Sequence, residues 1–171
     1  MQNYYDQNTL VCGLGSNIEP RRQYLQKAYV LLKETYLPLN CSGIYETEPI
    51  GLVKQENFLN CIVIFKSTDK PYIVLKNIQS VEAKLGRDRT NENHWGPRTI
   101  DIDIIFYGFY RLKDRELTIP HDQYKKRRFV IEPLLDIWPK FCDPFTGNSI
   151  DMYQYDVCQQ QIRKIKGSVD V

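Results

Sequence analysis

Several features that would assign the chain to a particular class are missing from its sequence. The five cysteines are odd in number and form no Cys-x-x-Cys pair, which argues against a disulfide framework or a zinc site and favours reduced thiols in a cytoplasmic protein. No apolar run approaches the roughly 18 residues that span a membrane. Residues 1–8 do not form the basic and apolar segments of a signal peptide. We therefore expect a cytoplasmic protein with no membrane partner.

A strong charge and a nucleophilic triad are also absent. The formal net charge of +2 is too small to predict nucleic acid as a partner. Neither of the two histidines, His94 and His121, stands in a Ser-His-Asp or Cys-His order that suggests covalent catalysis. With 171 residues, 42% hydrophobic and 26% charged, the chain is most simply one globular domain over residues 1–171 and a monomer. Any disorder is expected in residues 1–8 and at the end of the tail.

Hydrophobic periodicity predicts alternating strands and helices. Apolar and β-branched runs indicate strands at residues 9–13, 40–45, 58–67, 100–107 and around 116–119. Apolar stripes at helical spacing indicate helices from Pro20 to about residue 36, from Pro71 to Gly86 with Asp69 as the cap, and over 127–137 with a break at Pro133. The order of these elements predicts a ferredoxin-like β-α-β-β-α-β sandwich of the α+β class, extended by a C-terminal strand and helices. Its helices are expected on one face of an antiparallel sheet, leaving the other face for a ligand or for extra elements.

Two aspartates, Asp101 and Asp103, stand two positions apart in a strongly β-forming run. Successive side chains point to opposite faces of a strand, so the two carboxylates share one face, while the neighbouring isoleucines and Phe106 take the other. Because adjacent carboxylates repel, we expect a cation over them. Oxygen ligands suit Mg²⁺, and two such ions could clamp a phosphoryl group. Taken alone, the pair is equally well explained as a charged, solvent-facing strand edge.

A polar loop before the aspartates carries groups suited to phosphate. Its Trp95-Gly-Pro-Arg98-Thr sequence supplies a planar aromatic ring and a guanidinium that can bind phosphate through two hydrogen bonds. Arg87 and Arg89 enter the loop from its other end, although a solvated basic turn is the usual explanation for such a run. Closure of the loop would bring Arg87 and Arg98 onto one polyphosphate and exclude water during group transfer.

Two further motifs are less specific. Gly13-Leu-Gly-Ser-Asn17 follows a strand but lacks the Gly-Lys-Ser/Thr of a phosphate-binding P-loop, so a tight turn without a ligand is the simpler interpretation. Phe58 and Asn60 share a strand face, where a ring could stack on a flat ligand and an amide could bind the edge of that ligand. Taken alone, Phe58 and Phe129 are better explained as core residues, and Asn60 as an amide beside a turn.

Together these motifs resemble the 6-hydroxymethyl-7,8-dihydropterin pyrophosphokinase family. The resemblance runs from about Leu10 to Pro139 and rests on Gly13-Leu-Gly-Ser-Asn17, Tyr45-Glu-Thr-Glu-Pro-Ile-Gly51, Asn57-Phe-Leu-Asn60, residues 82–89, residues 95–103, and Leu117-Thr-Ile-Pro-His121 with Arg127 and Phe129. It implies an enzyme that transfers pyrophosphate from ATP to the hydroxymethyl group of the reduced pterin and releases AMP, in folate biosynthesis. ATP and the reduced pterin would be its partners.

The resemblance also implies roles for individual residues. Asp101 and Asp103 would hold two Mg²⁺ ions with ATP as co-substrate, and the catalytic residues would be Arg87, Arg98 and Trp95. The residues implied to bind the pterin are Thr47, Glu48, Ile50, Phe58, Asn60 and Phe129. The residues implied to bind ATP are Gln79, Arg89, Ile104, Thr118, His121 and Arg127.

Three residues depart from the pattern of the family: His94 replaces a common Arg, Asp122 a common Pro or Tyr, and Phe58 a frequent Tyr. One alternative from a different class is a non-catalytic ferredoxin-like domain that binds a ligand or RNA, although the acidic pair would repel RNA phosphates in the absence of metal. Another Mg²⁺-dependent nucleotidyl or phosphoryl transferase is a third hypothesis, disfavoured by the residues suited to a pterin, Phe58, Asn60 and Phe129.

Overall fold

The structure is a computed structural model that describes residues 5–49, 55–88 and 96–170. Its main sheet is antiparallel and has the strand order β5-β1-β4-β3-β8. Strand β2 pairs with β4 as well, beyond the end of β3. The strands of this sheet are β1 (Thr9–Ser16), β2 (Leu37–Cys41), β3 (Ile44–Thr47), β4 (Phe58–Lys66), β5 (Asp101–Tyr107) and β8 (Ile162–Ile165). Two short strands, β6 (Leu112–Lys113) and β7 (Thr118–Ile119), form a separate ribbon.

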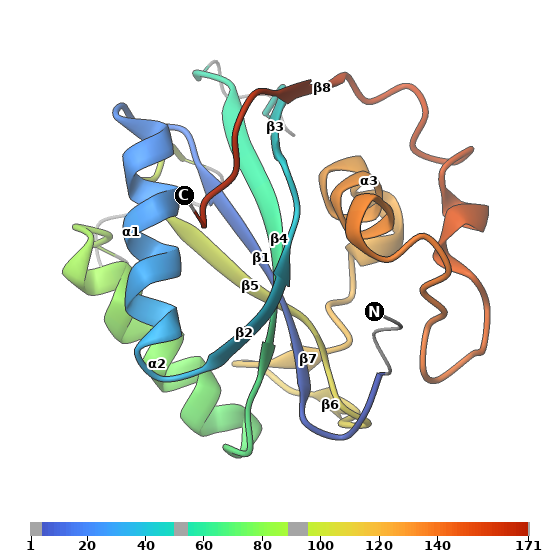
Figure 1. Cartoon of the computed structure of the whole chain (residues 1–171). Coiled ribbons are helices and arrows are strands. Elements are labelled where there is room, and N and C mark those ends of the chain that lie inside the picture. Colours follow the sequence, from blue (N-terminus) through green and yellow to red (C-terminus); the bar gives the residue numbers. More distant parts are fainter. Residues whose placement is uncertain (1–4, 50–54, 89–95, 171) are drawn as a thin grey trace.

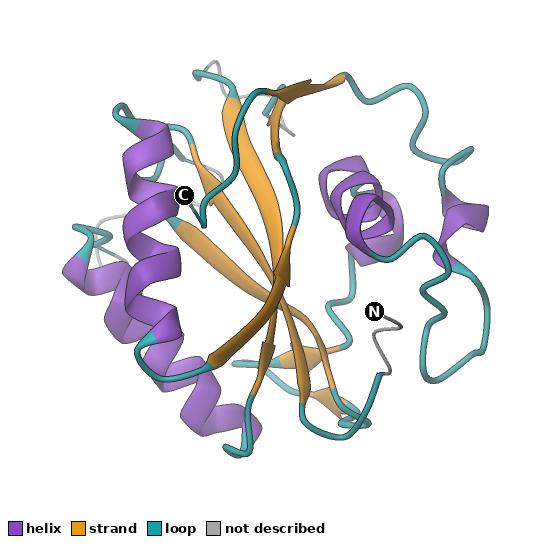
Figure 2. Ribbon diagram, in the orientation of Figure 1, coloured by secondary structure: helices purple, strands orange, loops and turns teal. Residues whose placement is uncertain are grey.

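Helices cover the sheet on both faces (Figure 1). Helices α1 (Arg21–Lys33) and α2 (Pro71–Lys84) lie on one face, and α3 (Arg128–Ile137) lies on the other (Figure 2). Two short 3-10 helices, η1 (Tyr124–Lys126) and η2 (Ile150–Tyr153), flank α3. The described residues contain no helix long and apolar enough to cross a membrane. The predicted ferredoxin-like α+β fold is confirmed, with the C-terminal elements added to it.

Each face of the sheet has its own hydrophobic core. On one side, Leu25 of α1 and Ile78 of α2 pack against Leu14 of β1. On the other side, Leu134 of α3 packs against Ile62 of β4. All five side chains are essentially inaccessible to solvent. Burial of this kind contributes about 1.5–3 kcal/mol for each large aliphatic side chain, so both layers hold the sheet in place.

A β-bulge changes the side-chain alternation of β5. The register with β1 shifts between Val11 and Cys12, which leaves Ile105 as the additional residue of β5. Phe106 consequently faces α3, and its ring centroid lies 4.8 Å from that of Tyr124. The prediction that Phe106 shares a face with the isoleucines before it is wrong, because an extra residue reverses every later side chain. Before the bulge the alternation is regular.

Several element boundaries differ from the sequence prediction. The predicted strand at 40–45 is divided into β2 and β3, because the pairing with β4 is interrupted where the Ser42 hydroxyl accepts the N–H of Ile62 at 2.9 Å. Asp69 does not cap α2, since Lys70 occupies the N-cap position without a side-chain hydrogen bond. Pro133 does not break α3, which continues through it with the proline ring buried. Gly86 ends the second helix as predicted, with a φ of 85° that favours glycine.

Candidate active site

Two of the predicted functional residues, Asp101 and Asn60, lie in one row across the sheet. Asp101 of β5 pairs with Gly15 of β1, Gly15 with Asn60 of β4, and Asn60 with Tyr45 of β3. Directly paired residues of neighbouring strands point to the same face, and this is the face covered by α3. Asp103 pairs with Gly13, two residues further along the same ladder. Asp101 and Asp103 therefore share a face, as the sequence predicts.

Glycine at position 15 lets the Asn60 amide lie close to β1, between the acidic pair and the predicted pterin residues. A Cβ atom added to Gly15 would lie 2.8 Å from Oδ1 of Asn60 and 3.7 Å from Cδ1 of Phe58. The Asn60 amide is buried and donates through Nδ2 to the hydroxyl of Thr47 at 2.8 Å. Phe58, Asn60 and Thr47 thus form a connected group beside a strand surface that carries no side chain.

Asp101 is paired with two arginines from opposite ends of the same loop. Its Oδ1 accepts from Nη1 of Arg87 at 2.5 Å, and its Oδ2 accepts from Nη1 of Arg98 at 2.9 Å. Oε1 of buried Glu82 also accepts from Arg87, at 2.6 Å, and from the N–H of Ile102 at 2.9 Å. Burial by itself would raise the pKa of Asp101, but the charges of Arg87 and Arg98 outweigh it and lower the pKa. Asp101 is therefore ionised.

Asp103 has a different electrostatic environment. Its Oδ2 accepts from Nη1 of Arg127 at 2.8 Å and lies 3.7 Å from Nε2 of His121. Burial and the neighbouring charge of Asp101 raise the pKa of Asp103. Burial also lowers the pKa of His121, and Nδ1 of its ring accepts the N–H of Gln123 at 3.1 Å. A neutral His121 therefore carries its proton on Nε2, toward Asp103.

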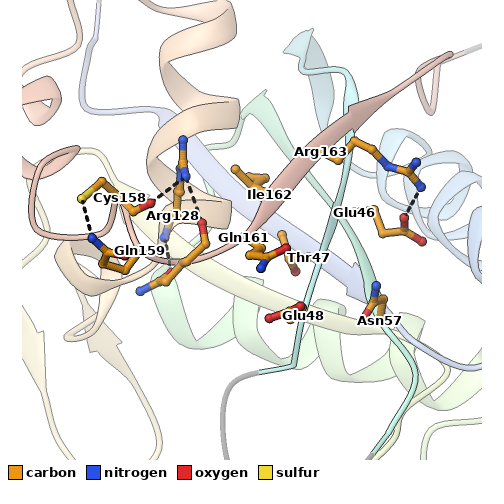
Figure 3. Close-up of a pocket in the computed structure, with 11 residues that line it drawn as sticks. Glu46, Thr47, Glu48, Asn57, Arg128, Cys158, Gln159, Gln161, Ile162 and Arg163 are labelled. Carbon is orange, nitrogen blue, oxygen red and sulfur yellow. Dashed lines mark hydrogen bonds and ion pairs between the residues drawn. The ribbon is translucent and has the colours of Figure 1, made fainter.

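Arg127 connects the acidic pair to the aromatic side of the site. Its guanidinium carbon lies 5.5 Å from the centre of the Phe129 ring, within the range of a cation–π contact. Phe129 lines a small cavity of about 110 Å³ together with Thr47 and Glu48. A larger cavity of about 490 Å³ shares Thr47 and Glu48 and extends toward β8 (Figure 3). Three of the predicted pterin residues, Thr47, Glu48 and Phe129, therefore line a cavity next to Arg127.

The two aspartates match the donor set of a Mg²⁺ site completed by a substrate. They present carboxylate oxygens on one strand face, and Mg²⁺ commonly takes one or two carboxylates, water and phosphate oxygens. Within residues 5–49, 55–88 and 96–170 there is no group of three or more acidic, cysteine or histidine side chains that could hold a metal. The residues present therefore suit an ion that arrives with phosphate ligands better than one enclosed entirely by protein.

The remaining predicted ATP residues surround β5. Gln79 is exposed on α2, which packs against β5, and half-buried Thr118 lies on β7, which also packs against β5. Ile104 is buried in the core beneath α1 and α2, so its side chain lies on the opposite face from the aspartates. Ile50, Arg89 and Trp95, together with the departure His94, lie outside the described residues.

Three positioning residues were not predicted from the sequence. Asn17 is buried at the end of β1, and its Oδ1 accepts the N–H of Arg98 at 2.8 Å. Glu82 supports Arg87 from within α2. Arg128 donates to backbone carbonyls of the C-terminal tail. For Glu82 the sequence offered one signal, because a glutamate on the buried side of a helix needs a partner. The partners of Asn17 and Arg128 are too distant in the chain to be predicted.

Comparison with known proteins identifies the family. The model of the 7,8-dihydro-6-hydroxymethylpterin-pyrophosphokinase (HPPK) family matches residues 11–139. The chain is 39% identical over 132 residues to the 2-amino-4-hydroxy-6-hydroxymethyldihydropteridine pyrophosphokinase of Bacillus subtilis, covering 76% of this chain and 78% of that protein. It is 38% identical over 136 residues to the protein of the same name from Aquifex aeolicus, covering 80% and 84%.

A solved structure supports the fold independently. Wild-type Plasmodium falciparum HPPK-DHPS with pteroate superposes with a TM-score of 0.70 at 17% identity, covering 91% of this chain and 43% of that one. At this identity the likeness concerns the fold alone. With the match of the family model over most of its length, the chain belongs to the 7,8-dihydro-6-hydroxymethylpterin-pyrophosphokinase family.

Proposed function

We propose that this protein transfers the pyrophosphoryl group of ATP to the hydroxymethyl oxygen of 6-hydroxymethyl-7,8-dihydropterin and releases AMP, as a step of folate biosynthesis. Family membership supports this reaction. The observation that carries the proposal is the row from Asp101 through Gly15 to Asn60 on one face of the sheet. The acidic end of this row suits phosphate transfer, and the end with the amide and the aromatic rings suits a flat acceptor. An RNA-binding role is not favoured, because carboxylates on that face repel a phosphate backbone.

On the acceptor side, the pterin ring would stack between Phe58 and Phe129. The Asn60 amide, with Thr47 as its hydrogen-bond partner, would bind the polar edge of the ring. Main-chain groups at Glu48 and Ile50 would bind the rest of the polar edge of the pterin. The absent side chain at Gly15 supports this placement, because it lets the Asn60 amide lie directly against β1, where a Cβ atom would displace it.

On the phosphate side, Asp101 and Asp103 would hold two Mg²⁺ ions that neutralise charge on the ATP phosphates. Arg87 and Arg98, now hydrogen-bonded to Asp101, would donate to the transferring group, with Trp95 moving in the same loop. The ATP site would be completed by Gln79, Arg89, Thr118, His121 and Arg127, and by Ile104 through its main chain, since its side chain is buried on the other face of β5. Arginines that exchange a carboxylate for a phosphate keep an anionic partner throughout, so their charge is never left buried and unpaired.

The chemistry needs positioning more than covalent help. The hydroxymethyl oxygen attacks the β-phosphorus of ATP, the bond from that phosphorus to the bridging α–β oxygen breaks, and AMP leaves with that oxygen. The hydroxyl proton of the acceptor is released to solvent. Holding the reactants in line and stabilising the spread negative charge supply most of the rate in such transfers. The four cationic or hydrogen-donating side chains around the aspartates, Arg87, Arg98, Arg127 and His121, provide that stabilisation.

We further propose that the protein acts in the cytoplasm as a monomeric single domain, without nucleic acid. The decisive assay incubates it with Mg²⁺, ATP and 6-hydroxymethyl-7,8-dihydropterin and separates the nucleotide products. AMP formation that requires the pterin supports the proposed function. Formation of ADP, or no turnover, overturns it.

A further inference from the structure

The C-terminal segment of residues 158–162 connects α3 with the edge of the sheet. This segment lies beyond residue 139, where the match of the family model ends. It leads into β8, which pairs with β3 so that Ile162 lies opposite Thr47 (Figure 1). The segment therefore runs from the layer of α3 to β3, which ends at Thr47, one of the residues predicted to bind the pterin.

Hydrogen bonds fasten this segment to the start of α3. Oε1 of Gln160 accepts the N–H of Arg128 at 2.9 Å, and Nε2 of Gln160 donates to the carbonyl of Lys126 at 2.7 Å. In return, the Arg128 guanidinium donates to the carbonyls of Cys158 at 3.1 Å and Gln160 at 2.9 Å. Four bonds at one junction hold the segment directly beside Phe129, the next residue of α3.

A second attachment fixes the far end of the same segment. Nζ of Lys164 on β8 lies 2.7 Å from both carboxylate oxygens of Asp136, near the end of α3. The backbone ladder with β3 holds β8 from the opposite side. The segment is thus held at both ends, so its position relative to α3 and β3 is defined.

The segment forms one wall of the cavity in Figure 3. Residues 158–163 line it on one side, and Glu46, Thr47 and Glu48 line it on the other. Gln161 immediately precedes Ile162, the first residue of β8, and lies beside Thr47 in the close-up. It is exposed, and its side-chain amide has no hydrogen-bond partner in the described part of the chain. An uncharged amide offers both a donor and an acceptor to the polar edge of a ligand.

We infer that residues 158–162 form a wall of the acceptor pocket, in which the Gln161 amide contacts the substrate and Gln160 positions the segment. This rests on the proposed function, since it assigns to the pterin the smaller cavity, which Thr47, Glu48 and Phe129 line and which Gln160 and Gln161 line as well. The wall supplies hydrogen-bonding groups that the region matched by the family model does not contain. It affects recognition of the acceptor and leaves the ATP side, across β1, unchanged.

The test compares the steady-state kinetics of Gln161→Ala and Gln160→Ala with those of the wild-type protein. Loss of one neutral hydrogen bond corresponds to a rise of about three- to tenfold in the KM for the pterin in Gln161→Ala. Gln160→Ala removes one bond to Arg128 of α3 and one to Lys126 of η1, and its KM for the pterin rises at least as much. The KM for ATP and kcat change less than about twofold in both variants. Gln23→Ala, an exposed glutamine of α1 on the opposite side of the sheet, is the matched control and behaves as wild type.

The outcomes separate this inference from the function on which it rests. A wild-type protein without pterin-dependent AMP release overturns the proposed function and the inference with it. A wild-type protein that turns over, with a pterin KM unchanged in Gln161→Ala, overturns the inference alone. Because Gln161 is exposed and makes no internal bond, that variant remains informative even if Gln160→Ala unfolds. Thermal melts of each variant show which of them are folded.

Discussion

Replacing Asn17 with alanine tests how the structure holds Arg98 in place. Oδ1 of Asn17 accepts the N–H of Arg98 at 2.8 Å, while Nδ2 donates to Oε1 of Gln55 at 2.9 Å and to the carbonyl of Glu56 at 3.3 Å. The side chain therefore joins the end of β1 to two loops. Asn17 is 2% exposed, so water does not replace these bonds without rearrangement.

The magnitude follows from those contacts. A buried hydrogen bond contributes about 0.5–1.5 kcal/mol net, and the longest of the three contributes at the lower end of that range. We expect Asn17→Ala to lower the free energy of unfolding by about 2–3 kcal/mol. One backbone bond, from the N–H of Asn17 to the carbonyl of Arg98 at 3.2 Å, remains and limits the displacement. Because misplacement of a catalytic group by about 1 Å can cost about a hundredfold in rate, kcat should fall by about ten- to a hundredfold.

Urea unfolding and steady-state AMP release measure the two effects. Asn148→Ala, which truncates an exposed asparagine whose side chain makes no hydrogen bond in the described residues, is the control and should leave both values unchanged. If Asn17→Ala lost stability but kept its full kcat, Arg98 would not depend on Asn17 for its position. If neither value changed, the hydrogen-bond network at the end of β1 would be wrong.

Three other changes probe separate parts of the molecule. Asp103→Ala should abolish turnover without loss of thermal stability, because it also removes repulsion from a neighbouring carboxylate; near-full activity would refute the metal assignment. Gly15→Ala should raise the KM for the pterin by displacing the Asn60 amide, with ATP binding unchanged; equal KM values would show that the pterin does not depend on this position of the amide. Burial would raise the pKa of Asp143, but the hydroxyl of Tyr124 at 2.6 Å and other donors lower it overall from its ordinary value of 3.8. The native state therefore binds fewer protons, and this stabilisation is present above about pH 4 and lost as the pH falls through the lowered pKa. Asp143→Asn should flatten the pH dependence of urea unfolding below pH 4; an unchanged slope would contradict the assigned pair.

The sequence predicted the features of the site that depend on local periodicity. A spacing of two in a β-forming run was enough to place Asp101 and Asp103 on one face. The position of Phe106 was not predictable, because the bulge at Ile105 depends on pairing with a strand about 95 residues earlier in the chain. The same limit applies to Arg98: its residue type indicated an anionic partner, but its contact with Asn17 spans 81 positions.

The C-terminal tail shows most clearly what the sequence alone could not predict. The four residues of β8, Ile-Arg-Lys-Ile, contain too few apolar positions to predict a strand, and the sequence predicted none in this part of the tail. Its place is decided by pairing with β3 and by the bond from Lys164 to Asp136. Interactions of this kind become apparent only when the whole sheet has formed.

The edge position of β8 has a consequence for how the protein behaves at high concentration. An unpaired sheet edge can add a strand from another molecule and begin aggregation. Here the outermost strand beyond β3 is only four residues long and exposes the side chains of Arg163 and Lys164. Both side chains are held in ion pairs, Arg163 with Glu46 and Lys164 with Asp136, and a strand this short gives an incoming strand little backbone to pair with. The tail therefore protects β3 from association between molecules, and a chain shortened before Ile162 would expose that strand and become prone to aggregate.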